Sequence, residues 1–180
     1  MQMTTMKVLN RKIDDDIIAQ LDTATNDTGT AKKADLDLVV KCRTILGNNF
    51  VPIEEEDDMF AIVTPAFEGY LLQIPEYSSA DYVDVKPLSG PAGRYRRWAG
   101  FNWICHPRLT GVGTSSEKCY FMHRNAIGHA FDTDNLAVKI GYDDEQDYSW
   151  ARATAYMGSK LLQQSGIVQA LHDGSAYVAS

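Results

Sequence analysis

The stretch Met59–Leu72, MFAIVTPAFEGYLL, indicates how the fold begins. Its first six residues, MFAIVT, form an apolar, partly β-branched run that predicts a buried strand. Pro65 follows at once, and proline is favoured in the first turn of a helix, where its missing N–H costs nothing. Phe67, Leu71 and Leu72 then supply the apolar side of a short helix. The stretch therefore predicts a buried strand that runs directly into a helix.

Two further helices are predicted upstream of this stretch. One begins near Asn10, has Ile13, Ile17 and Leu21 on one face, and carries aspartates 14–16 in its first turn, where carboxylates favour the helix dipole. The next spans 35–47, with Asp35 as its N-cap and Gly47 as its C-terminal glycine.

Downstream of the stretch, the pattern is mostly that of strands. Alternation predicts strands over 98–106, 118–123, 136–140 and 167–171, and 125–131 is expected to be a short helix or extended. Residues 149–162 fit either period, and we favour strand because Gly158 and Gly166 would interrupt a helix. Glycine- and proline-rich loops are expected at 87–93 and 109–116. This order of elements indicates an α+β fold with a mixed sheet and flanking helices.

Composition limits the possible functions. The 180 residues suit about one domain, and the 17 basic against 24 acidic side chains give a net charge of −7. Such a charge disfavours wrapping nucleic acid over the whole surface. No apolar run approaches the roughly 20 residues of a membrane span, so no membrane partner is expected, and no secretion signal opens the chain. Three cysteines without a CxxC pair indicate reduced thiols.

Four residues are candidates for metal or thiol chemistry. Cys105, Cys119, His123 and His129 form a C-x13-C-x3-H-x5-H pattern, which lacks the tight ligand pair typical of zinc sites. A small zinc- or thiol-dependent enzyme using Cys119 and His123 stays an alternative, although no catalytic signature surrounds the cysteine. We expect a buried strand thiol, no cofactor, no metal and no enzymatic activity.

One basic and aromatic run, Arg94-Tyr95-Arg96-Arg97-Trp98, has two interpretations. Arginines and aromatic rings bind single-stranded nucleic acid, so a nucleic-acid-binding module is one alternative. The same residue types are enriched at protein interfaces, and the negative net charge favours a contact between subunits.

The sequence resembles tailed-phage major capsid (coat) proteins with the Hong Kong 97-type shell fold. The resemblance covers about residues 10–174 and lies in the order of several stretches. These are RKIDDDIIAQLDTAT, LGNNFVP, MFAIVTPAFEGYLL, GRYRRWAGFNWICHPRL, CYFMHRNAIGHA and IGYDDEQDYSWARATAYMGSKLLQQSGIVQ. It implies one compact unit with a helical, spine-like part of the peripheral domain over 1–58. An axial domain over 59–140 and return strands of the peripheral domain over 141–180 complete it.

The resemblance also implies a function. Such a protein would self-assemble into the pentamers and hexamers of a phage head that encloses DNA without sequence-specific binding. It would be found in the virion, and in the host cytoplasm during assembly, with scaffolding and portal proteins as further partners. Few residues precede the first expected helix here, so the N-terminal arm and extended loop of such proteins would be largely missing.

Three regions are the expected contacts between subunits. They are the loop 87–98, the loop 109–117, and the acidic stretch 54–58 facing a neighbour's Arg94, Arg96 or Arg97. The candidate interface residues are Arg94, Tyr95, Arg96, Arg97, Trp98, Glu54, Glu55, Glu56, Thr114 and Ser115.

Overall fold

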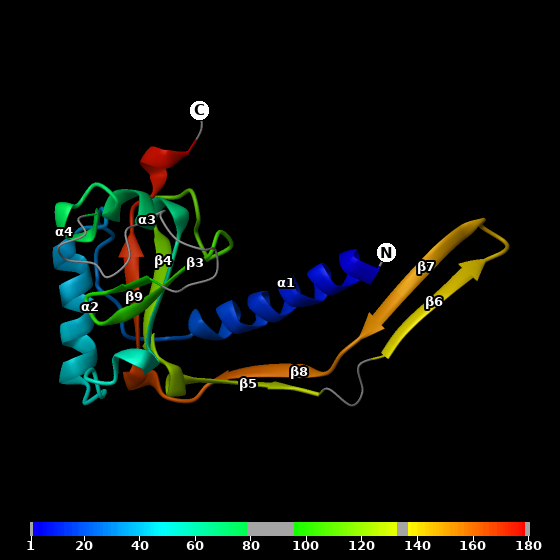
Figure 1. The fold of residues 1–180 in the computed structure, drawn as a ribbon, viewed down its shortest axis with the longest axis horizontal. Helices are drawn as coiled ribbons and strands as arrows, with labels where there is room; N and C mark the ends of the chain where they lie inside the picture. Colours follow the sequence, from blue (N-terminus) through cyan, green and yellow to red (C-terminus); the bar gives the residue numbers. More distant parts are fainter. Residues whose placement is uncertain (1, 79–95, 133–136, 179–180) are drawn as a thin grey trace.

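A computed structural model describes residues 2–78, 96–132 and 137–178. Its main feature is a five-stranded sheet in the order β2-β3-β1-β4-β9 (Figure 1). The strands are β1 Met59–Val63, β2 Arg96–Trp98, β3 Phe101–Cys105, β4 Glu117–His123 and β9 Ile167–His172. β1 pairs with β3 in parallel, and the other pairs are antiparallel, so the predicted mixed sheet is confirmed.

The predicted transition from strand to helix is confirmed at β1. Helix α3, Pro65–Leu71, begins directly after the strand, with Pro65 in its first turn. The side chain of Thr64 caps it by accepting a hydrogen bond from the N–H of Phe67 at 3.2 Å. The cap satisfies one of the N–H groups that a helix leaves open at its start. A further short helix, α4, covers Pro75–Ser78.

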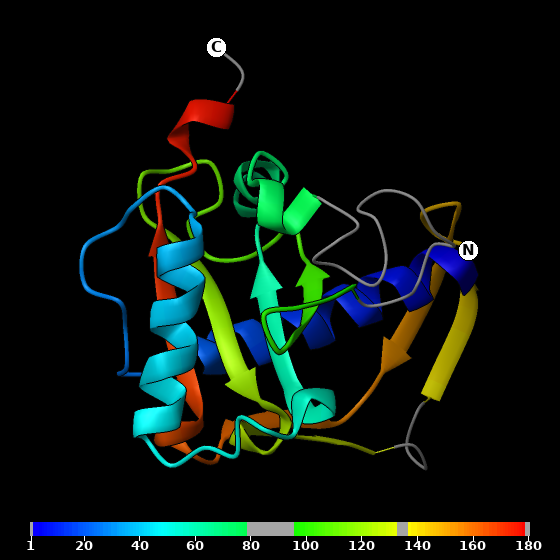
Figure 2. The ribbon, with the colours of Figure 1, turned by 60° about the vertical axis from the view of Figure 1, so that its left-hand side comes forward.

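Alternation along β4 produces two cores, one on each face of the sheet. Cys119 and Phe121 lie in a core with helix α2, Leu36–Asn48, and α3, whereas Tyr120 and Met122 lie in a second core with Leu21 of helix α1. Helix α1 spans Gln2–Leu21. Figure 2 shows α2 in front of the sheet and α1 passing behind it. The period of two in strand side chains therefore decides which helix each residue meets.

The first helix begins earlier than predicted. It starts at Gln2 rather than near Asn10, because residues 2–9 contain no proline or glycine to end it. Asp14 and Asp15 consequently lie in the middle of the helix, away from its positive end. Asp15 instead forms an ion pair with Arg108 at 2.7 Å, and Asp14 lies 3.6 Å from His106. These contacts attach α1 to the loop that follows β3.

The end of α2 and the predicted strand over 98–106 also need correction. Asp35 is the N-cap as predicted, but α2 continues through Gly47 to Asn48, and Phe50 rather than the glycine adopts a positive φ of 61°. The expected strand over 98–106 is a hairpin, β2–β3. Its turn residues, Ala99 and Gly100, have φ angles of 53° and 77°, as a two-residue turn with both φ angles positive requires.

Two narrow ribbons extend away from the main sheet (Figure 1). Strand β5, Ile127–Phe131, pairs with β8, Met157–Leu161, and β6, Ala137–Asp143, pairs with β7, Tyr148–Thr154. The strand interpretation of 149–162 is therefore confirmed. Helix α1 lies along β8 and also contacts β7. Short 3-10 helices occur at Glu56–Asp58 (η1), Arg124–Ala126 (η2), Gln164–Gly166 (η3) and Ser175–Tyr177 (η4).

The expected domain limit at residue 140 falls inside a strand. That strand is β6, and β9, from the expected return segment 141–180, pairs with β4 in the main sheet.

Across the described ranges, the helices are all too short or too polar to cross a bilayer.

Candidate subunit interface

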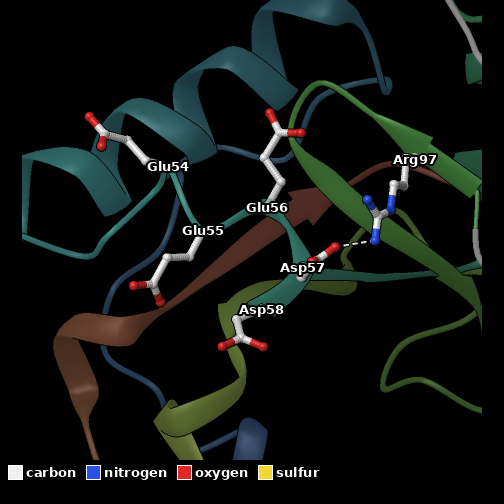
Figure 3. Close-up of a pocket in the computed structure, with 6 residues that line it drawn as sticks. All are labelled: Glu54, Glu55, Glu56, Asp57, Asp58 and Arg97. Carbon is white, nitrogen blue, oxygen red and sulfur yellow. Dashed lines mark hydrogen bonds and ion pairs between the residues drawn. The ribbon is translucent and has the colours of Figure 1, made fainter.

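The acidic stretch 54–58 forms a turn on the surface, fixed by a buried amide. The side chain of Asn102 is 5% exposed, and its Nδ2 lies 2.8 Å from the carbonyl of Glu56 and 3.0 Å from that of Met59. Glu54, Glu55 and Glu56 are exposed and, together with Asp57, Asp58 and Arg97, line a surface hollow (Figure 3). Asn102 of β3 therefore holds the backbone of the turn, while the carboxylates of the turn face solvent.

The basic run meets this turn within a single chain. Arg97 forms an ion pair with Asp57, drawn as the dashed line in Figure 3. Trp98 is 8% exposed, and its indole packs edge-on against Tyr77 with the ring centroids 4.9 Å apart, so this ring belongs to the core. Arg94 and Tyr95 lie outside the described residues. Arg96 opens β2, where it is in register with Trp103 of β3.

The loop 109–116 is anchored by Glu117, the first residue of β4. This carboxylate is fully buried, accepts a hydrogen bond from the N–H of Gly113 at 2.7 Å, and accepts another from the Thr64 hydroxyl at 2.5 Å. Thr64 is also the cap of α3, so one carboxylate joins the loop, the helix and the sheet. Thr114 and Ser115 are exposed on that loop.

A buried histidine lies beside this carboxylate. The His172 side chain is fully buried, its Nδ1 donates to the carbonyl of Lys32 at 3.1 Å, and its Nε2 lies 4.0 Å from a Glu117 oxygen. Burial lowers the pKa of His172 below its ordinary value, although the Lys32 carbonyl and the Glu117 carboxylate act in the opposite direction. The imidazole is therefore neutral at physiological pH.

The structure does not assemble the four-residue zinc pattern or a thiol catalytic site. Cys119 and His123 stand four positions apart on β4, about 13 Å at the usual rise of a strand. Cys105 is exposed at the end of β3, and His129 lies on the separate β5–β8 ribbon. Burial raises the pKa of the Cys119 thiol to about 12, so it is not a thiolate nucleophile at neutral pH.

The sequence interpretation missed one exposed apolar face. On the β6–β7 ribbon, Val138, Ile140 and Tyr142 share one face and are 47%, 58% and 56% exposed. Tyr148 and Trp150 are exposed on the other face. Alternation predicts the strand 136–140, but it does not say whether the apolar face of that strand meets the chain's own core.

The phage capsid protein family model matches residues 1–173. No curated protein matches the sequence.

Solved structures show the same fold at low identity. A chain from Mycobacterium phage Che8 has a TM-score of 0.68 at 19% identity over 93% of this chain. A chain of the Cyanophage P-SCSP1u capsid has a TM-score of 0.57 at 15% identity over 87% of this chain. A chain of the holo-SrpI encapsulin complex from Synechococcus elongatus PCC 7942 has a TM-score of 0.61 at 11% identity over 99% of this chain. The present chain spans 61%, 59% and 67% of these chains, respectively.

These findings agree with the resemblance read from the residues. The mixed sheet, the flanking helices and the extended ribbons form the Hong Kong 97-type capsid fold. The family model covers nearly the whole chain. The chain belongs to the phage capsid protein family.

Proposed function

We propose that this protein is a structural subunit that self-associates into the shell of a phage head. The observation that carries the proposal beyond family membership is the β6–β7 ribbon. An isolated two-stranded hairpin is at best marginally stable in water, and this one exposes Val138, Ile140 and Tyr142 on one face. Contiguous exposed apolar side chains are typical of protein contact sites. A second copy of the chain, repeated around a symmetry axis, would cover them.

Two exposed polar regions belong to the same proposal. Glu54, Glu55 and Glu56 on the acidic turn, and Thr114 and Ser115 on the loop held by Glu117, lie on the surface of the main sheet's body. Their attachment to buried groups gives them fixed positions, which favours a specific contact. Arg94, Tyr95 and Arg96 complete the candidate set. The ion pair with Asp57 holds the Arg97 side chain, and in the proposal Arg97 would contact a neighbouring subunit from this position.

Membership of the phage capsid protein family supports the remaining proposed roles. We propose a virion location in the head and a host cytoplasmic stage during assembly, with scaffolding and portal proteins as further partners. The shell would enclose DNA without reading its sequence, as suits a chain of net charge −7. An axial part over 59–140, with peripheral parts over 1–58 and 141–180, remains the proposed domain organisation. No catalytic activity is proposed.

The test compares the parent chain with two single variants of one strand. Ile140→Glu puts a charge on the apolar face, whereas Lys139→Gln changes the net charge by the same amount on the opposite face. Negative-stain electron microscopy and light scattering are expected to show rings or shells for the parent and Lys139→Gln, and mainly the 20.0 kDa monomer for Ile140→Glu. A parent that stays monomeric at every concentration contradicts self-association. Assembly by Ile140→Glu contradicts the assigned contact face.

A further inference from the structure

The ring of His123, the last residue of β4, has an unsatisfied nitrogen. The residue is 6% exposed, and its Nε2 is buried without a hydrogen-bond partner. The other nitrogen, Nδ1, accepts a long hydrogen bond of 3.3 Å from the N–H of Asn125. Buried polar atoms are nearly always satisfied, so an orphaned imidazole nitrogen calls for a ligand.

This nitrogen faces two carboxylates of the acidic turn. Glu55 Oε2 lies 3.7 Å from Nε2, and one oxygen each of Glu55 and Asp58 lies with Nε2 within 4.8 Å of one another. In Figure 3, Glu55 and Asp58 point to the same side of the turn, whereas Glu56 points the other way. The buried side chain of Asn102 binds the backbone carbonyls of Glu56 and Met59, so the turn that carries these carboxylates has a fixed backbone.

We propose that Glu55, Asp58 and His123 bind a divalent transition-metal ion, with Zn²⁺ the best fit. Zinc takes imidazole nitrogen and carboxylate oxygen at about 2.0–2.2 Å, which separates tetrahedral ligand atoms by about 3.4 Å. The observed 3.7 Å between His123 and Glu55 is close to that value. The exposed side chain of Glu55 rotates to close the remaining gap, and water completes the coordination.

The charges around the site fit this ion. Two carboxylates balance a divalent cation, and Arg124 pairs at 3.1 Å with one oxygen of Asp58, whose second oxygen can coordinate. Metal at Nε2 requires the imidazole proton to lie on Nδ1, so binding would replace the long hydrogen bond of 3.3 Å that Nδ1 accepts from the Asn125 N–H. Magnesium and calcium prefer six or more oxygen ligands, whereas this set includes a nitrogen. The proposed site shares only His123 with the C-x13-C-x3-H-x5-H pattern of the sequence.

The experiment titrates the whole chain with ZnCl₂ by calorimetry. The exposed thiol of Cys105 is first changed to serine so that it does not compete. One ion per chain is expected, with Glu55→Gln weakening binding at least tenfold. Glu54→Gln, the neighbouring exposed carboxylate outside the triad, serves as the matched control and should bind as the parent does. MgCl₂ should bind at least a hundredfold more weakly than ZnCl₂.

A second measurement does not depend on any variant folding. In ¹⁵N-resolved imidazole spectra of the parent chain, Zn²⁺ should shift Nε2 of His123 and leave His129 unchanged. Each of four results would overturn the site. Two of them are an absence of saturable Zn²⁺ binding and an affinity for Mg²⁺ equal to that for Zn²⁺. The other two are equal weakening by Glu54→Gln and Glu55→Gln, and an unshifted His123 Nε2. Equal weakening would mean that the ion is attracted by the acidic run as a whole.

Discussion

Replacing Glu117 by leucine should destabilise the protein more than any surface change. The carboxylate is the acceptor for two donors, the Thr64 hydroxyl and the Gly113 N–H. An apolar side chain of similar size leaves both donors without a partner inside the protein. An unsatisfied donor as fully buried as Thr64 costs about 1–3 kcal/mol, and the half-buried Gly113 N–H costs less, so the free energy of unfolding should fall by about 2–4 kcal/mol. That is a large part of the roughly 5–15 kcal/mol of a typical domain.

The isosteric variant Glu117→Gln separates hydrogen bonding from shape. Its amide carbonyl still accepts from Gly113, and its NH₂ group faces Thr64, whose hydroxyl then turns to accept. We expect less than half of the loss caused by leucine. Glu76→Leu, on an exposed position of α4, is the control and should stay within about 0.5 kcal/mol of the parent.

Urea unfolding followed by circular dichroism measures these differences, with the slope m checked for constancy. Hydrogen exchange of the Gly113 amide reports the loop directly and should accelerate most in the leucine variant. The reasoning fails if Glu117→Leu lies within 0.5 kcal/mol of the parent, because the two donors would then have found other partners. It also fails if the leucine and glutamine variants lose equal stability, since charge or shape would then matter more than the hydrogen bonds.

Three further outcomes are expected. A Cβ at Gly174 would lie 2.0 Å from Glu117 Oε1, so Gly174→Ala should lose about 1–3 kcal/mol of stability, whereas Gly158→Ala, whose Cβ meets nothing within 4 Å, should not. The folded state lowers the pKa of His172, so unfolding takes up a proton when the pH lies below the ordinary value of 6.5. The free energy of unfolding should therefore hold above that pH and decline as the pH falls through it. Urea titrations at several pH values should show a smaller decline in His172→Phe. In native protein, a thiol reagent should modify Cys105 quickly, and Cys42 and Cys119 only after unfolding, because burial raises the pKa of both to about 12.

The sequence predicted those elements whose local chemistry agrees with their tertiary setting. Asp35 and Pro65 are helix-start signals that act within one turn, and both lie where expected, whereas the cap supplied by Thr64 was not predicted. Gly47 misled because a glycine inside the last turn is tolerated when packing continues the helix. The Ala99–Gly100 turn was missed because alanine rarely adopts a positive φ, so nothing marked a hairpin there.

The candidate sites were harder to predict, because they depend on contacts between distant residues. Asp57 lies 40 positions before Arg97, and charge alone could not say whether they meet within one chain or between two. The partners of His123 lie on a turn that β4 reaches only through its pairing with β1. The exposed face of β6 has the same alternation as a core strand, so only the fold distinguishes them.

The two ribbons leave and rejoin the main sheet at one place. β4 and β9 are antiparallel neighbours, and the N–H groups of Leu162 and Gln163 both donate to the carbonyl of Ala126, at 2.8 and 3.1 Å. Residues 127–161 therefore form an insertion between β4 and β9, and the length of this insertion does not affect the pairing of those two strands. Adding one residue to each strand beside the 144–147 turn would lengthen the ribbon by about 3.4 Å and preserve the pairing of the residues before it. In the proposed shell, a change in the length of the ribbon would alter how far one subunit reaches toward the next while the main sheet stays as it is.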